Sequence, residues 1–237
     1  MKFLSIILFT VCGIAAVNTT SAQGIGKYTA NSNVQIMQDR DGKPILTKDY
    51  TDVVGSPYLV QDWSTGIVKL DNGQTYKDVS LKYNLMEDEV YFKSEKGGEP
   101  LSFADPVSEF TITYKDNETG ETHTNYYRKG FNGISRTTPN SYFEVLSDGT
   151  VQLIKKKSVG IVVSQEWNSA TKVKNFKDDT KYYLVKNGQA TQVKKDKKIL
   201  ENFSDKKQQM ENYASSNKIN FKSDADLSKL VTYYNSL

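Results

Sequence analysis

The chain has 237 residues and a formal net charge of +3, with 31 Lys and Arg against 28 Asp and Glu. It contains a single cysteine, Cys12, and a single histidine, His123. One chain therefore cannot form an internal disulfide, and a mature chain without Cys12 could not form a zinc site built on two or three His or Cys ligands.

The N-terminus has the three zones of a secretory signal peptide. A lysine at position 2 is followed by roughly fifteen mostly apolar residues, Phe3 to Val17, which is the usual size of a signal-peptide core. Thr20 and Ala22 then place small side chains at the −3 and −1 positions of a cut before Gln23. Because a membrane span needs about twenty apolar residues, we expect residues 1–22 to be removed and the protein to be exported.

Cys12 allows a second interpretation, as the lipid-bearing cysteine of a lipoprotein. Such a cysteine closes the apolar run, whereas Cys12 lies inside it, so we favour cleavage before Gln23 without a lipid. Because that cleavage removes the only cysteine, the mature chain would have neither disulfides nor thiol chemistry, and its stability would come from a hydrophobic core.

After an N-terminal extension, residues 23–49, the pattern of residues 50–194 is typical of β-strands. Apolar side chains alternate with polar ones, as in Val79–Leu85 and again around Phe110, Ile112 and Tyr114. Asn-Gly and Asp-Gly turns separate several of these runs and tolerate the positive φ of tight hairpins. They predict three hairpins, which pair residues 67–70 with 74–76, 142–146 with 150–154, and 182–186 with 190–194.

The period becomes helical in residues 195–237, where we expect short helices packed on the β domain. Apolar residues at helical spacing predict two helices broken near Ser204, with Ile199, Leu200, Phe203, Met210 and Tyr213 on their inner side. Ser223 and Asp226 resemble an N-terminal cap. An apolar stripe follows at Leu227, Leu230, Val231 and Tyr234. The stripe predicts packing against the sheet, and a partner-binding helix is the alternative.

The predicted fold class is therefore mainly β. Antiparallel hairpins or a meander would form a sandwich or an open, barrel-like sheet, and the chain would end in a short helical segment. Short turns cannot join parallel strands, which is why we expect the antiparallel arrangement.

Charge is divided unevenly along the chain. Residues 23–152 hold 13 Lys and Arg against 19 Asp and Glu, whereas residues 153–218 hold 15 against 7. The basic region 153–218 is compatible with binding to an anionic membrane surface, lipopolysaccharide or acidic glycans. Alternatively, the two regions attract each other, or the lysines simply keep a surface solvated. Nucleic acid is a poor candidate for an exported chain without an interleaved aromatic and basic platform.

We assign no catalytic residue, metal site or cofactor from the sequence. Serine hydrolysis would need His123 as its base, and the chain has no Gly-x-Ser-x-Gly motif. The segment Asp39–Gly42 lacks the later ligands of a calcium loop, and we expect a turn there. Residues 87–89 are the densest acidic cluster and predict a hairpin tip. Carboxylate catalysis stays open, because two acids about 5–9.5 Å apart would suffice for glycoside hydrolysis.

Four aromatic residues are the candidate binding residues: Tyr58, Trp63, Tyr76 and Tyr83. Rings with a polar tip serve glycan or peptide recognition well. The alternative is that they fill the core or a sheet face, because aromatic residues favour half-buried strands.

Several segments resemble a group of uncharacterised exported proteins of Bacteroidota-type Gram-negative bacteria. The resemblance lies in Ser56–Leu59, Trp63–Val68, Gly73–Tyr76, Leu81–Asn84, Lys181–Leu184, Leu230–Asn235 and the Ala22-Gln23 junction. It implies periplasmic or outer-membrane association, and it transfers no catalytic residue.

Together these patterns predict an exported, envelope-associated protein that lies in the periplasm or at the outer membrane or cell surface and is not transmembrane. Its most favoured role is a non-enzymatic binding module for another envelope protein or a glycan. A carboxylate-dependent envelope hydrolase is the alternative.

Overall fold

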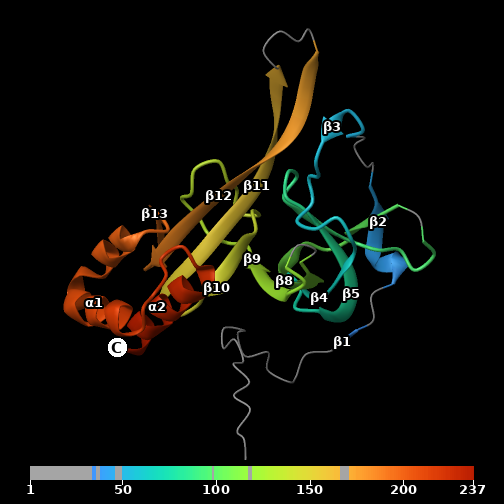
Figure 1. Ribbon diagram of the computed structural model, residues 1–237. Helices are drawn as coiled ribbons and strands as arrows, with labels where there is room; N and C mark the ends of the chain where they lie inside the picture. The colour runs from blue at the N-terminus through green and yellow to red at the C-terminus, as the bar shows by residue number, and fades with distance from the viewer. Residues whose placement is uncertain (1–33, 36–37, 46–49, 98, 117–118, 166–170) are drawn as a thin grey trace, which may run out of the picture.

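A computed structural model describes residues 34–35, 38–45, 50–97, 99–116, 119–165 and 171–237 (Figure 1). The predicted signal peptide, with Cys12 and the cleavage site before Gln23, lies outside the described residues. The described chain is mainly β, and helices form its C-terminal end, as the sequence predicts.

Thirteen strands form one sheet in the described part of the chain. They are β1 (Val34–Gln35), β2 (Gly42–Pro44), β3 (Val53–Val54), β4 (Ser64–Leu70), β5 (Thr75–Asn84), β6 (Glu89–Phe92), β7 (Leu101–Phe103), β8 (Val107–Lys115), β9 (Thr122–Arg128), β10 (Phe143–Ser147), β11 (Val151–Gln165), β12 (Lys172–Lys186) and β13 (Gln189–Val193). Their order is β13-β12-β11-β10-β9-β8-β4-β5-β6-β7-β2, and neighbours on this path are antiparallel. The sheet does not close on itself.

The three hairpins predicted from turn residues are confirmed. Val68 pairs with Tyr76 across β4 and β5, Val145 with Ile154 across β10 and β11, and Tyr183 with Gln192 across β12 and β13. The last turn has φ of 52° and 74° at its Asn-Gly pair, the conformation that favours these two residue types.

The N-terminal extension contributes to the sheet. β1 and β2 lie within residues 23–49, where β1 runs parallel to β5 and β2 pairs with β7. The short 3-10 helix η1 (Asp39–Asp41) precedes β2, and the side chain of Asp39 accepts hydrogen bonds from Ser94 and Glu95. This segment is therefore a turn, as expected, and part of the β structure.

The C-terminal helices are the 3-10 helix η2 (Lys197–Lys206), α1 (Lys207–Ser216) and α2 (Asp224–Ser236). The backbone leaves helical geometry at Phe203, directly before the predicted break at Ser204. The hydroxyl of Ser223 accepts the predicted capping hydrogen bond from the backbone N–H of Asp226, at 3.3 Å. None of the helices in the described part of the chain has the length and apolar character that crossing a membrane requires.

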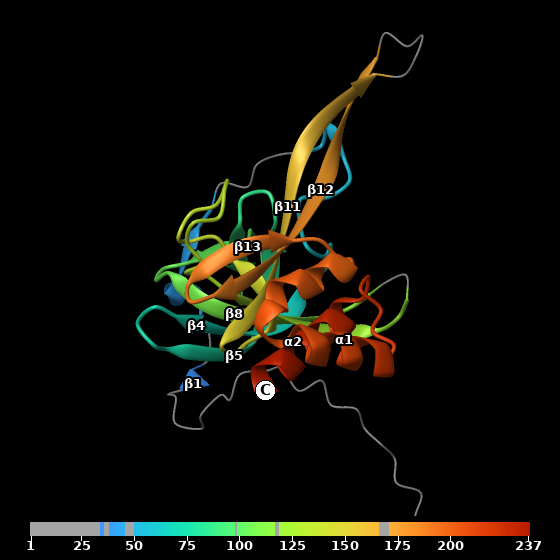
Figure 2. The same cartoon turned by 90° about the vertical axis from the view of Figure 1, so that its left-hand side faces the viewer.

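The apolar stripe of α2 packs on the chain's own sheet, and Figure 2 shows the helices lying together beside β13 and the inner part of β11. Leu227, Leu230 and Val231 are fully buried, and they form one cluster with Leu153 and Leu184 of the sheet. The prediction of a sheet-packing helix is therefore confirmed.

Two further clusters complete the interior. One lies within the curved N-terminal part of the sheet and includes Val68, Leu81, Phe110 and Ile112. The other packs Phe131 and neighbouring residues against the face of the sheet opposite the helices. The N-terminal and C-terminal parts of the sheet thus have separate cores.

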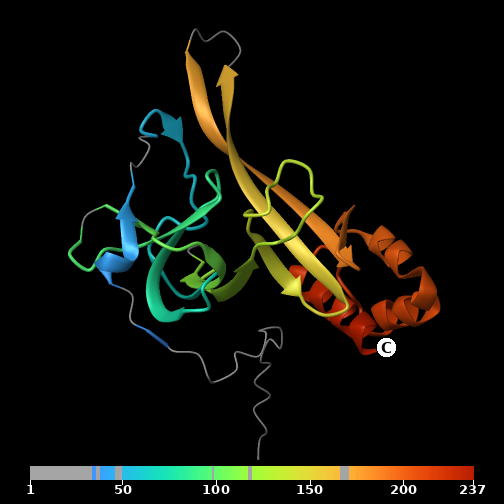
Figure 3. The same ribbon diagram turned by 180° about the vertical axis from the view of Figure 1, so that it is seen from behind.

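The hairpin of β11 and β12 extends beyond the body of the molecule (Figures 1 and 3). The two strands pair along their full length, from Val151–Lys186 to Gln165–Lys172. Pairing of β11 with β10 reaches only to Lys155. We call residues 158–165 and 172–179, the outer half of this hairpin, the arm.

Candidate functional site

Two of the four predicted binding residues belong to the core. Tyr76 is 3% exposed and Tyr83 is 1% exposed. The ring of Tyr83 makes edge contacts with Phe110, Tyr127 and Tyr142 at centroid distances of 5.3, 5.1 and 6.1 Å. Their assignment as binding residues is therefore corrected, because their rings fill the N-terminal core as the alternative interpretation proposed.

Tyr58 and Trp63 lie together near the surface, half-buried. The ammonium group of Lys82 lies 4.8 Å from the Tyr58 ring centre and 5.2 Å from the Trp63 ring centre. Burial lowers the pKa of Lys82, and Asp62 opposes this shift. Because each ring already contacts this cation, the cluster offers less aromatic surface for a sugar than the sequence suggested.

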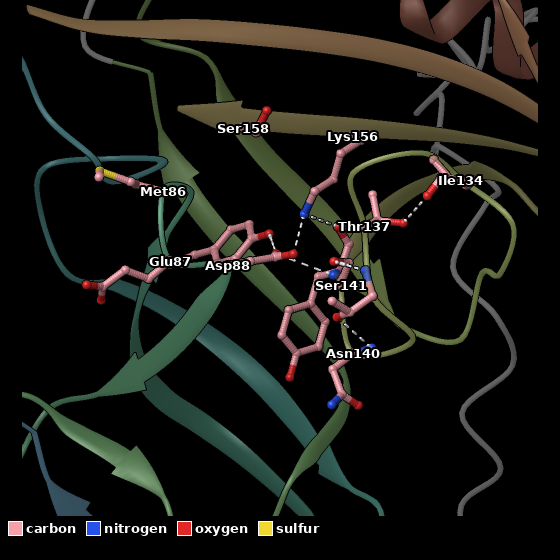
Figure 4. Close-up of polar contacts among 12 residues, drawn as sticks. Met86, Glu87, Asp88, Ile134, Thr137, Asn140, Ser141, Lys156 and Ser158 are labelled. Carbon is pink, nitrogen blue, oxygen red and sulfur yellow. Dashed lines mark hydrogen bonds and ion pairs between the residues drawn. The ribbon is translucent and has the colours of Figure 1, made fainter. Parts of the chain in front are cut away.

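The turn between β5 and β6 carries the predicted acidic cluster, and Figure 4 shows that two of its side chains, Glu87 and Asp88, point in different directions. Asp88 points toward Lys156 of β11, whereas Glu87 points away from Asp88. The carboxylate of Asp88 lies 2.6 Å from the Lys156 ammonium and accepts a hydrogen bond from the Tyr83 hydroxyl, also at 2.6 Å. The cluster is therefore a hairpin tip, as predicted, and one of its acids, Asp88, is partly buried against Lys156, with 23% of its side chain exposed.

Lys156 completes this contact from the other side. Its ammonium donates to the backbone carbonyl of Tyr142 at 2.9 Å, and the residue is only 9% exposed. Burial lowers the pKa of Lys156, while Asp88 opposes the shift. Because both charged groups have their hydrogen-bonding partners within the protein, this pair links the β5–β6 turn to β11 and lacks the free amine that a nucleophile needs.

A second buried charged cluster lies between the sheet and α2. The ammonium of Lys155 lies 2.6 Å from the carboxylate of Glu144 and 3.0 Å from that of Asp224. Asp224 also accepts hydrogen bonds from Lys195 at 2.6 Å and from the Tyr182 hydroxyl at 3.0 Å.

The two carboxylates of this cluster differ in pKa. Burial raises the pKa of Glu144 despite the nearby Lys155. Burial acts in the same direction on Asp224, but the ammonium groups of Lys155 and Lys195 outweigh it and hold the pKa of Asp224 below its usual value. A raised and a lowered carboxylate can act as acid and base. Here, however, Lys155 occupies the space between them where a glycosidic bond would have to lie.

Three further features of the described residues bear on possible chemistry. His123 lies on β9, and its ring is 5.6 Å from that of Tyr114. A pocket beside Arg128 and Phe131 includes neither carboxylate of the Lys155 cluster. Within the described ranges, no group of three or more His, Cys, Asp or Glu residues is arranged to hold a metal ion.

Ion pairs connect the acidic region, residues 23–152, with the basic region, residues 153–218. Lys155 pairs with Glu144, Lys156 with Asp88 and Lys174 with Asp52, and each pair joins residues 153–218 to residues 23–152. The basic region therefore supplies contacts within the molecule, which is one of the three interpretations that the sequence allowed.

The arm and its neighbour β3 carry most of the large hydrophobic residues that are exposed in the described part of the chain. Five of the six large hydrophobic residues that are exposed lie on it or on the neighbouring strand β3: Val54 at 61%, Ile161 at 37%, Val162 at 41%, Val163 at 60% and Val173 at 38%. Scattered single exposed apolar residues are normal, but a grouped set marks an interaction surface.

The two edges of the arm differ. Residues 158–164 of β11 pair with β12, and no other described strand pairs with them. The opposite edge is flanked by β3, which pairs with β12 at Lys174 and Asn175. In Figures 1 and 3, β3 stands on the β12 side of the arm and β11 borders open space.

This surface was not among the binding residues predicted from the sequence. A signal was present, because Ser158–Gln165 contains no charged residue and no proline within an otherwise lysine-rich region. Edge strands usually carry charges, prolines or bulges that prevent pairing with other chains. Period-two alternation alone does not reveal which strand lacks a neighbour, and so it could not show that this segment is an edge.

Comparisons with known proteins identify no relative: no family model, no curated protein and no solved structure matches the chain. The resemblance to exported proteins of Bacteroidota-type bacteria therefore remains a hypothesis.

Proposed function

We propose that this protein is an exported, non-enzymatic binding module of the cell envelope and that it joins another polypeptide through its arm. One observation carries the proposal. Among the strands that the structure describes, only β12 pairs with residues 158–164 of β11, while three consecutive apolar residues, 161–163, are exposed on them.

Strand addition is the mode of binding that this geometry favours. An extended segment can exchange main-chain hydrogen bonds with a free strand edge, and side chains on both faces then provide selectivity. Alternation places Ile161 and Val163 on one face and Val162 on the other, so an added strand would cover apolar surface on both faces. The absence of charge from Ser158–Gln165 means that the edge has no protection against such pairing.

The other two roles considered from the sequence have weaker support. A glycan would have to use Tyr58 and Trp63, whose rings contact Lys82. A carboxylate hydrolase would have to use acids such as Glu144 and Asp224, which Lys155 bridges.

The proposal is tested by photo-crosslinking in the native envelope. A Val162→Cys variant in a Cys12→Ala background is labelled with a maleimide–benzophenone reagent, illuminated and analysed by mass spectrometry. We expect a specific adduct with a polypeptide, because Val162 lies beside the free edge.

Thr65→Cys is the matched control. Thr65 is also an exposed strand residue, but its strand β4 has neighbours on both sides, β5 and β8. Equal adducts at both positions, or none at Val162, would contradict the proposal.

A further inference from the structure

We infer that the polypeptide that pairs with the arm is β11 of a second copy of this chain, so that two molecules join through antiparallel pairing of residues 158–164. This inference rests on the proposed function, because it names the occupant of the same edge. It makes the protein a symmetric dimer whose interface consists of identical surfaces.

The segment is nearly symmetric about its centre. Residues 158–164 read Ser-Val-Gly-Ile-Val-Val-Ser. In antiparallel pairing about Ile161, Ser158 of one copy lies opposite Ser164 of the other, and Val159 lies opposite Val163. Ile161 then lies opposite its own counterpart. Polar residues therefore meet polar residues, and β-branched residues meet β-branched residues, which are favourable cross-strand pairs.

This register also places the apolar residues of both copies on the same face of the joined sheet. Directly opposed residues in antiparallel strands share a face, so Val159, Ile161 and Val163 of both copies would form one continuous apolar strip. Within each molecule, Val159 is buried against the N-terminal core, whereas Ile161 and Val163 are exposed. A slip of one residue would place apolar residues on opposite faces of the joined sheet and break the strip.

Neither charge nor the surroundings of Gly160 oppose this pairing. No charged residue lies within 158–165, so the pairing places no like charges opposite one another. The space around Gly160 is open: a Cβ atom added to this residue would have no heavy atom within 4 Å apart from those of Gly160 and its two chain neighbours. Val162 of the second copy, which would lie opposite Gly160, therefore has room.

The other edge of the arm is unsuited to the same role. Along β12, the residues from 172 to 179 include Lys172, Lys174, Lys177, Asp178 and Asp179. Such charges discourage edge pairing, and β3 covers part of this edge. Because the β12 edge is charged and partly covered, whereas in the described part of the chain the β11 edge is neither, β11 is the strand that pairs with the second copy.

The first experiment measures the mass of the purified exported chain by sedimentation equilibrium over a range of concentrations. We expect a dimer, and we expect Ile161→Lys to raise the dissociation constant by about tenfold or more, because two ammonium groups would meet at the symmetry axis. Val173→Lys is the matched control. It introduces the same charge at a similarly exposed position of the arm, but on β12, and it should remain dimeric.

The second experiment tests the register. In a Cys12→Ala background, Ile161→Cys should form a disulfide-linked dimer under mild oxidation, because Ile161 faces itself across the axis. Val162→Cys should not, because Val162 faces Gly160. Equal crosslinking of both variants, or equal dissociation of Ile161→Lys and Val173→Lys, would overturn the inferred pairing.

The two proposals can fail separately. A monomeric chain that still crosslinks to a different polypeptide through Val162→Cys would overturn pairing with a second copy and leave the proposed function standing. A monomeric chain without any adduct would overturn both. Circular dichroism of each variant shows that a lost dimer does not result from a lost fold.

Discussion

Asp88 shows how one residue can change its role when the chain folds. In the sequence it belongs to an acidic turn, where all three acids would be solvated. In the structure its backbone has a φ of 59°, which a short polar side chain tolerates, and its carboxylate points toward Lys156. This turn conformation places the Asp88 carboxylate against the Lys156 ammonium.

The Asp88–Lys156 pair gives the first prediction. Asp88→Asn keeps the turn conformation and acceptors for hydrogen bonds, but it leaves the buried Lys156 ammonium without an opposite charge. We expect a loss of about 3 kcal/mol in the free energy of unfolding, measured by urea denaturation.

Two variants serve as controls for this prediction. Asp179→Asn breaks an exposed pair with Lys181 and should cost less than about 1 kcal/mol. Combining Asp88→Asn with Lys156→Met should recover part of the lost stability, because no unpaired buried charge remains. A double variant less stable than Asp88→Asn alone would contradict this explanation.

At the scale of elements, α2 is held on the sheet by its apolar stripe and by a charged contact at its first turn. Leu230 is fully buried in the cluster between helix and sheet, and Asp224 lies at the helix N-terminus, where a negative charge is favourable. Three donors from the β part, Lys155, Tyr182 and Lys195, bind the Asp224 carboxylate.

The apolar stripe gives the second prediction. Leu230→Ala should lower the free energy of unfolding by about 2–5 kcal/mol, because it removes buried methyl groups and leaves a cavity. Lys229→Ala changes the neighbouring residue, whose side chain is 64% exposed, and should change stability by less than about 0.5 kcal/mol. Similar losses in both variants, measured by urea denaturation, would mean that the stripe does not hold α2.

The charged contact gives the third prediction. Because the pKa of Asp224 is lowered in the folded protein, its contribution to stability is present above the unfolded value of 3.8 and is lost as pH falls through the folded pKa. Asp224→Asn should therefore cost about 2 kcal/mol near pH 7 and progressively less below pH 4, as measured by urea denaturation at each pH.

The control for the pH dependence is Glu211→Gln. Glu211 belongs to an exposed pair with Lys207 on α1, at 4.0 Å, and its replacement should have little effect at any pH. A penalty for Asp224→Asn that does not change between pH 7 and pH 3 would show that the carboxylate charge is not what holds the helix.

At the scale of the whole molecule, one sheet connects a curved N-terminal part, a helix-covered C-terminal part and the arm. The two parts have separate cores, and ion pairs such as Lys156–Asp88 join them. The arm shares in neither helical packing nor pairing with β10, although its residues Val159 and Phe176 pack against the N-terminal core and Phe176 contacts Tyr50. We therefore expect it to open more readily than the body.

Limited proteolysis gives the fourth prediction. Trypsin should first cut after Lys172 or Lys174, which are exposed near the outer end of β12. The fragments should stay together during gel filtration, because residues 151–157 of β11 remain paired with β12. First cleavage in α1 or α2, or separation of the fragments, would contradict this view of the arm.

Local sequence determined the elements of this protein. Turn residues such as Asn187-Gly188 impose hairpins through backbone geometry, Ser223 begins a helix through one hydrogen bond, and the stripe including Leu230 requires an apolar surface to cover it. These effects act over a few residues and can therefore be predicted from the sequence.

Tertiary structure decided which of these elements form the interior and which form the candidate site. Alternation marks Tyr83 as one face of a strand, but only the curvature of the sheet makes that face the core. A run of β-branched residues likewise favours a strand at Ile161, but only the end of pairing with β10 at Lys155 leaves that edge of β11 without a neighbouring strand in the described part of the chain. Burial and edge exposure depend on contacts between distant segments, and a local pattern does not contain them.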